Sequence, residues 1–228
     1  MSEWTLQFSF SFRNLLKQRG VLGVTLLLTT LLISMLMLAN RLDQFADTWF
    51  GLLHSQMILL VLLTPILFNA VWSGRVKPFE FKTILYRLRR PETYFLSHIL
   101  SVWLVLGGSV VVFDSAFWLL YAQGTDPILW AGAMLQIGLT VGFVTALTAF
   151  FSLLLRRTIY SLLPMLMYLF VSLSFIPNPM YALWFSPDLI EQAAAEPKWI
   201  AARAILLVWI LLLLIISAVW FRRRVIRR

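Results

Sequence analysis

The sequence predicts an all-α membrane protein with six transmembrane helices, and three observations lead to this fold class. Apolar residues make up 61% of the 228 residues and charged residues only 13%, whereas charged residues are about 25% of a soluble domain. The apolar residues form six runs, each near the ~20 residues that a helix needs to cross a bilayer. Basic residues gather between alternate runs. We therefore expect a single transmembrane domain over residues 1–228.

The first expected element, residues 4–19, precedes the apolar runs. Its alternating Phe and Ser residues would also fit a strand, but an unpaired strand beside lipid leaves backbone groups without hydrogen bonds. As a helix, the segment places basic side chains mostly opposite an apolar stripe. The stripe consists of Trp4, Phe8, Phe12 and Leu15, and the basic side chains are Arg13, Lys17 and Arg19. This pattern predicts an amphipathic helix that lies at the interface of an anionic leaflet.

The six apolar runs are the expected spans, and the basic residues between them set the orientation. The spans cover residues 21–40, 49–72, 98–121, 128–155, 160–175 and 200–221. All but three of the 19 lysines and arginines lie on one side of this arrangement, the exceptions being Arg41, Lys198 and Arg203. Because lysine and arginine are retained on the cytoplasmic side, we expect a multi-pass cell-membrane protein with both termini in the cytoplasm.

The outer loop between the fifth and sixth spans, residues 176–199, is too long for a simple turn and contains four prolines. Its Ser-Pro-Asp sequence at residues 186–188 is typical of a helix start. Two interpretations remain open: an aromatic belt followed by a surface loop, or an outer gate over a transport pathway. The residues that would form this outer segment are Met180, Trp184, Phe185 and Asp188.

Sequence motifs of catalysis are missing from the chain. It has no cysteine, and neither of its two histidines, His54 and His98, begins an HExxH pair. It also has no GxSxG nucleophile motif and no GxxxxGK[ST] phosphate loop. We therefore expect no enzyme activity, metal site or cofactor in this chain. The net charge of +9 is placed for topology and lipid contact, which argues against nucleic acid as a partner.

Two polar residues lie well inside the expected third and fourth spans. Asp114 and Gln136 would reach similar depths if these spans are antiparallel neighbours. An ionised Asp inside a span costs about 2.5–3.5 kcal/mol, so we expect it to face protein or water. A hydrogen bond between helices and a contact to substrate or a proton both remain open.

Small residues recur along the fourth span at Gly138, Gly142 and Ala146. Such a small-xxx-small stripe favours close packing of helices in membranes. We expect this stripe to be a packing surface.

The largest charged interruption, residues 73–97, follows the second span. Within it, apolar side chains fall in about a 100° arc of a helix, with basic side chains around the remainder and Pro91 at its end. The helix could bind anionic lipid, or it could fit a groove on a cytoplasmic partner. The apolar side chains are Phe81, Ile84, Leu85 and Leu88, and the basic ones are Lys82, Arg87, Arg89 and Arg90.

This order of parts resembles the ABC-2 family of ABC-transporter permeases. That family has an N-terminal interfacial helix, six spans, a coupling helix after the second span and a re-entrant outer segment between the last two spans. The closest local similarity is KPFEFKTILYRLRRPETYFLSHIL, residues 77–100. Its Pro91, Glu92, Thr93, Tyr94 and Leu96 follow the family's order, whereas the usual Gly-Thr opening is replaced at residues 79–82.

The resemblance implies an exporter permease that works as a dimer, with the same chain or a second permease subunit. Two separate ATPase subunits would bind ATP and Mg²⁺ and dock on the coupling helix. The implied docking residues are Phe81, Ile84, Leu85, Leu88, Arg89 and Arg90, a second cytoplasmic contact is Arg156 and Arg157, and pathway candidates are Asp114 and Gln136. Drugs, antimicrobial peptides, lipids and polysaccharide precursors all fit the composition as cargo.

Two other classes of protein remain open. The first is a membrane-assembly or scaffold protein whose basic loop binds only lipid, and the second is an intramembrane enzyme built around Asp114. The scaffold predicts no nucleotide-dependent activity in any partner. The enzyme predicts that Asp114→Asn abolishes turnover, which a permease would at least partly tolerate.

Overall fold

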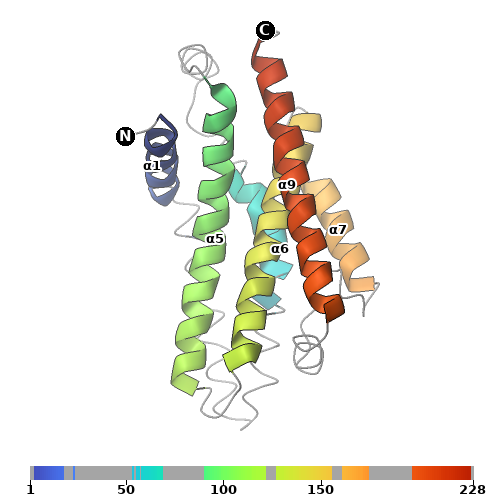
Figure 1. The fold of residues 1–228 in the computed structure, drawn as a ribbon. Coiled ribbons are helices and arrows are strands. Elements are labelled where there is room, and N and C mark those ends of the chain that lie inside the picture. Colours follow the sequence, from blue (N-terminus) through green and yellow to red (C-terminus); the bar gives the residue numbers. More distant parts are fainter. Residues whose placement is uncertain are drawn as a thin grey trace.

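The computed structural model shows an all-α protein, as the sequence predicts. It describes residues 3–17, 23, 53, 55–56, 58–68, 90–121, 127–155, 161–174 and 197–226. The helices are α1 (Glu3–Leu16), α5 (Pro91–Tyr121), α6 (Pro127–Leu154), α7 (Leu162–Ser174), α9 (Pro197–Ile226) and a shorter helix Ile58–Phe68 (Figure 1). The predicted first span, 21–40, lies outside the described residues except at residue 23.

Three of these helices are long and apolar enough to cross a membrane, which indicates a multi-pass membrane protein. Their apolar stretches are Pro91–Leu119, Trp130–Leu154 and Arg203–Arg223, with mean hydropathies of 2.0, 2.0 and 2.9. At 1.5 Å per residue, even the shortest of these is about 30 Å long, the thickness of the hydrocarbon core. The helix α7 has 13 residues and, at about 20 Å, is shorter than that core.

Proline begins each of the three long helices, at Pro91, Pro127 and Pro197. Proline suits the first helical position because it needs no N–H partner there and its φ is already helical. The helix α5 therefore begins seven residues before the predicted start of the third span at residue 98. Pro91 ends the amphipathic pattern of the basic loop, but it also starts α5, with the backbone N–H of Thr93 donating to the carbonyl of Arg90 at 3.2 Å.

The long helices run side by side, with α6 between α5 and α9 (Figure 1). The chain descends α5, returns along α6, descends α7 and returns along α9, so α6 and α9 are parallel and both oppose α5. The two chain ends lie at the same end of the bundle, where α5 starts and α9 finishes. We call this the basic end, after Arg90, Arg222 and Arg223, and the opposite end the far end.

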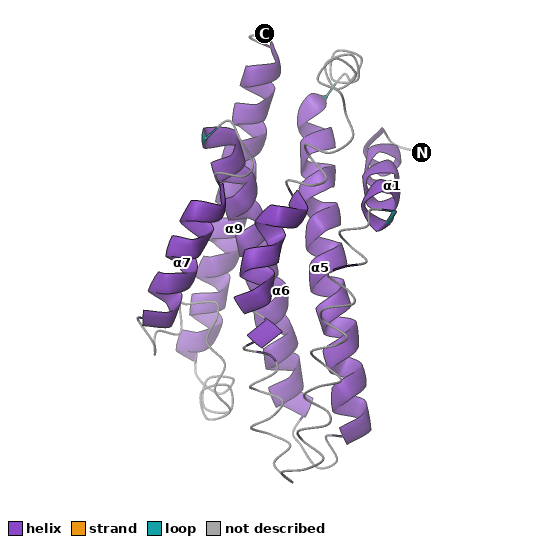
Figure 2. Ribbon diagram, turned by 180° about the vertical axis from the view of Figure 1, so that it is seen from behind, coloured by secondary structure: helices purple, strands orange, loops and turns teal. Residues whose placement is uncertain are grey.

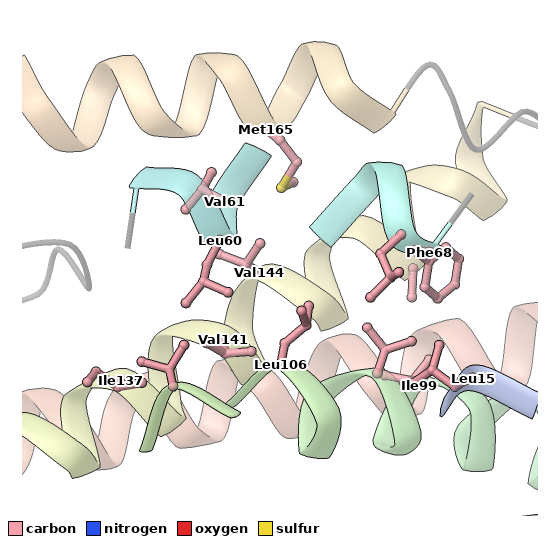
Figure 3. Close-up of a cluster of buried hydrophobic side chains, with 14 of the residues drawn as sticks. Leu15, Leu60, Val61, Phe68, Ile99, Leu106, Ile137, Val141, Val144 and Met165 are labelled. Atoms are coloured by element: carbon pink, nitrogen blue, oxygen red, sulfur yellow. The ribbon is translucent and has the colours of Figure 1, made fainter. Parts of the chain in front are cut away.

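The centre of the bundle is an apolar core to which every described helix contributes, α9 through its inner face. Leu106 from α5, Val141 and Val144 from α6, Met165 from α7 and Val61 from the short helix Ile58–Phe68 all belong to this core (Figure 3). Two-thirds of the α6 apolar stretch is buried, at 67%, against 28% for α9. The helix α6 is therefore central, and α9 turns most of its apolar surface outward, as expected of a helix facing lipid.

The small-residue stripe of α6 packs against an indole from α5. The Trp103 Nε1–H donates to the Gly138 carbonyl oxygen at 2.8 Å. A Cβ added at Gly142 would lie 2.6 Å from two carbons of the same indole. The stripe is therefore a packing surface, as predicted, but the group it accommodates is a tryptophan side chain.

Candidate functional site

The basic end joins α5 to α1 through a face of α1 that differs from the predicted stripe. The buried residues of α1 are Gln7, Ser11 and Leu15, spaced four residues apart. The predicted apolar stripe shares only Leu15 with this face. Trp4, Phe8 and Phe12 instead stack on one another beside it, with ring centroids 5.6 and 5.8 Å apart. The expected helix is confirmed, and its buried face is turned toward polar residues.

Polar contacts explain why this face of α1 is buried. Thr93 Oγ1 lies 2.7 Å from Gln7 Oε1, and Ser11 Oγ lies 3.4 Å from His98 Nδ1. Since Gln7 contacts Thr93 and Ser11 contacts His98, about one turn further along, α1 runs in the same direction as α5. Figure 2 shows the two helices side by side. The helix therefore stands along the first turns of α5 instead of lying across the ends of the spans. Its place at the lipid interface stays a prediction.

Two further elements reach the same turns of α5. The ring of Phe68, at the end of the short helix Ile58–Phe68, lies 5.5 Å from the His98 imidazole. From α9, Phe221 stacks on Phe95 with centroids 4.7 Å apart and planes 11° from parallel. Such an aromatic pair contributes about 0.5–1.5 kcal/mol beyond its buried area.

An ion pair adds little to this junction. Arg222 Nη1 lies 3.8 Å from Glu92 Oε1, and the arginine side chain is 60% exposed. Ion pairs at exposed positions are worth about 0–1 kcal/mol because water and salt screen them. The aromatic and polar contacts therefore hold the elements together.

We call this group of contacts the basic-end junction. It connects the start of α5 to α1, to the short helix Ile58–Phe68 and to α9, and consists of Gln7, Ser11, Phe68, Thr93, Phe95, His98 and Phe221. Arg90, the last residue before α5, is exposed. The 31-residue helix α5 therefore begins directly after this exposed residue.

A second polar region lies in the far half of α5. Gln56 Nε2 donates a hydrogen bond of 3.0 Å to Asp114 Oδ1, and both side chains are fully buried. The expected hydrogen bond between helices is therefore present, but its partner is Gln56 from the predicted second span. Sequence reasoning missed Gln56, although an amide within an apolar run was the available signal.

Gln136, the other pathway candidate, is also buried. The contact between Trp118 of α5 and Trp130 of α6, whose tilted rings have centroids 5.8 Å apart, indicates the register between the two helices. That register places Gln136 within about a turn of the height of Asp114, as the antiparallel arrangement predicts. On its own helix, Gln136 Nε2 lies 3.5 Å from Thr140 Oγ1.

Most of the other predicted site residues fall outside the described residues. Of the docking set only Arg90 is described. The predicted positions that lie outside the described residues are Phe81, Ile84, Leu85, Leu88, Arg89, Arg156, Arg157, Met180, Trp184, Phe185 and Asp188. Across the described ranges, no three His, Cys, Asp or Glu side chains come together in a way that could hold a metal ion.

Comparisons of the chain with models of protein families, with characterised proteins and with solved structures found no match. The fold therefore defines the class directly: an all-α, multi-pass membrane protein, with three candidate membrane-spanning helices among the residues that the structure describes.

Proposed function

We propose that this chain is the transmembrane permease subunit of an ABC-2 type exporter, driven by ATP that separate cytoplasmic ATPase subunits hydrolyse. The observation that carries the proposal is the basic-end junction. It fixes the first turns of α5, directly after the basic loop, to α1 and α9. A partner that moves the loop would therefore move several helices together.

In this proposal the basic end faces the cytoplasm, and the loop after the second span is the coupling helix. Leu85 and Leu88 would lie on its apolar stripe, and Arg89 and Arg90 would supply charge beside it. An amphipathic helix presented in this way fits a hydrophobic groove on a partner. Arg156 and Arg157, which follow α6, would give the ATPase a second contact at the same end.

The far half of the bundle would form the exit route. The proposed exporter is a dimer in which cargo passes along the interface of two permease subunits. Asp114 and Gln136 would lie near this route, and the segment containing Trp184 and Asp188 would gate it. The outward apolar surface of α9, which includes Val208 and Trp209 at 54% exposure each, is available to lipid or to a second subunit.

A membrane-contact role for α1 is the second candidate function, and one observation favours it. The outward face of α1 combines the exposed apolar side chains Leu6 and Phe10 with exposed Arg13 and Lys17. Apolar and basic groups on one helix face are typical of binding to anionic lipid. A scaffold protein would use this face without any ATPase.

Co-purification with an ATPase tests the exporter proposal. The chain, carrying a photo-crosslinker at Arg89, is isolated from its native membranes and searched for a crosslinked protein with a Walker A motif and ATPase activity. We expect such a partner with the wild type and its loss in Leu85→Asp/Leu88→Asp. Arg223→Asp, an exposed change at the end of α9, is the matched control and should retain it.

The outcome separates the classes. Failure of the wild type to retain a nucleotide-hydrolysing partner would refute the exporter proposal. If the wild type and Leu85→Asp/Leu88→Asp both bind anionic vesicles and neither binds an ATPase, the scaffold alternative is supported. An enzyme built around Asp114 would instead lose all turnover in Asp114→Asn.

A further inference from the structure

The hydrogen bond between Gln56 and Asp114 leaves two polar atoms of the same pair unsatisfied. Gln56 Nε2 donates to Asp114 Oδ1 at 3.0 Å. Gln56 Oε1 and Asp114 Oδ2 are both buried, and within the part of the chain that the structure describes neither has a hydrogen-bond partner. Both atoms are acceptors if Asp114 is ionised. Unsatisfied buried acceptors are rare in folded proteins and call for an explanation.

The surroundings of the pair do not favour a charge. The short helix Ile58–Phe68 and α6 contain no Asp, Glu, Lys, Arg or His. Among the described residues Asp114 makes no ion pair, and its hydrogen-bond partner is the neutral amide of Gln56. The other titratable or charged side chains of α5 are Glu92, Tyr94 and His98 at its basic end and Tyr121 at its last residue, and α7 contains Tyr168. On α9 they are Lys198 and Arg203 near its start and Arg222, Arg223 and Arg224 near its end.

Rotation of the amide does not resolve the mismatch. Exchanging the oxygen and nitrogen of Gln56 would place Oε1 against Asp114 Oδ1, so that two acceptors face each other. The carboxyl group itself can supply the missing donor, because a protonated carboxylic acid carries one O–H. One proton on Oδ2 would turn that atom into a donor and give Gln56 Oε1 the partner that it lacks.

We propose that Asp114 is a proton-binding site and that it forms a neutral acid–amide pair with Gln56, in which the Asp114 Oδ2–H donates to Gln56 Oε1. The pair then joins α5 to the predicted second span by two reciprocal hydrogen bonds and buries no charge. Loss of the proton would remove one of these bonds and leave a carboxylate in an apolar interior. Release of the proton therefore requires water to enter between the two helices. The proposal does not depend on the exporter function.

Infrared spectroscopy of the protein in lipid membranes at neutral pH tests the proton directly. We expect the wild type to show a protonated-carboxyl C=O band that Asp114→Asn removes. Glu92→Gln is the control, because Glu92 is a partly exposed carboxylate at the basic end. It should remove carboxylate absorption and leave the protonated-carboxyl band unchanged. If Asp114→Asn removes only carboxylate absorption, the proposal is overturned.

Thermal unfolding in detergent gives an independent measurement. In Asp114→Asn the amide Nδ2–H takes the place of the proposed O–H, so the unfolding temperature should equal that of the wild type within error. Asp114→Leu should unfold at a lower temperature because Gln56 loses its partner. If Asp114 were ionised, Asn would relieve its buried charge and raise the unfolding temperature. A rise, or a loss as large as that of Asp114→Leu, would contradict the acid–amide pair.

Discussion

The two ends of α5 are held in contrasting ways. At the basic end its first turns meet α1, the short helix Ile58–Phe68 and α9 through several separate contacts, among them the Phe95–Phe221 stack and the Thr93–Gln7 hydrogen bond. In the far half, two fully buried polar side chains, Gln56 and Asp114, depend on each other. At the basic end, the loss of any one contact costs little stability, because the others remain. In the buried polar pair, removing either partner leaves the other without a hydrogen bond, so the loss costs more.

The largest expected effect is therefore at the buried pair. Gln56→Leu removes the hydrogen-bond partner of Asp114 and leaves its carboxyl group buried, which should lower the free energy of unfolding by about 1–3 kcal/mol. Denaturant unfolding in detergent measures this loss. The matched control is Gln56→Leu/Asp114→Leu, in which both polar groups are replaced, and we expect it to recover much of the stability. If Gln56→Leu is as stable as the wild type, the two ends of α5 do not differ in the way described.

An effect of similar size is expected halfway along α5, where Trp103 packs on α6. Gly142→Ala would place its Cβ 2.6 Å from the indole, and the resulting overpacking should cost about 1–3 kcal/mol. Gly108→Ala on α5 is the matched control, because an added Cβ there meets nothing within 4 Å. That control should be neutral or stabilising, by up to ~1 kcal/mol, from helix propensity. Equal unfolding temperatures for the two variants would contradict the close indole contact.

The smallest effects are expected at the basic end. Phe221→Leu removes the aromatic stack on Phe95 but keeps an apolar side chain, and it should cost about 0.5–1.5 kcal/mol. Arg222→Ala should cost less, about 0–1 kcal/mol, with a cost that shrinks as salt is added. Unfolding of each variant at low and high salt checks both values. A larger loss in Arg222→Ala than in Gln56→Leu would reverse the comparison.

Much of the fold was predictable because it depends on local composition and spacing. Apolar runs of membrane-spanning length give α5, α6 and α9 whatever their neighbours are. The start of α5 at Pro91 could also have been predicted, since proline favours the first position of a helix. The amphipathic pattern before Pro91 indicated only the end of the loop helix, so the start of α5 seven residues before the predicted span was not recognised.

The buried face of α1 was less predictable. Its apolar residues Trp4, Phe8 and Phe12 suggested one face, whereas Gln7, Ser11 and Leu15 form the buried one. The pattern of one helix shows which side chains are apolar, but it does not show that another helix offers Thr93 and His98 as partners. A polar face is buried where a second helix can satisfy it.

By itself, the sequence determined the class of fold, the long apolar helices, the burial of Asp114 and its need for a partner. Only the tertiary structure decided that this partner is Gln56, 58 residues away, and that α5 is joined to α1 and α9 at one end. The physical reason is the distance along the chain over which each effect acts. The effects of hydrophobicity and proline depend on a residue and its nearest neighbours in the sequence. A hydrogen bond between helices depends instead on which helices lie side by side and in what register.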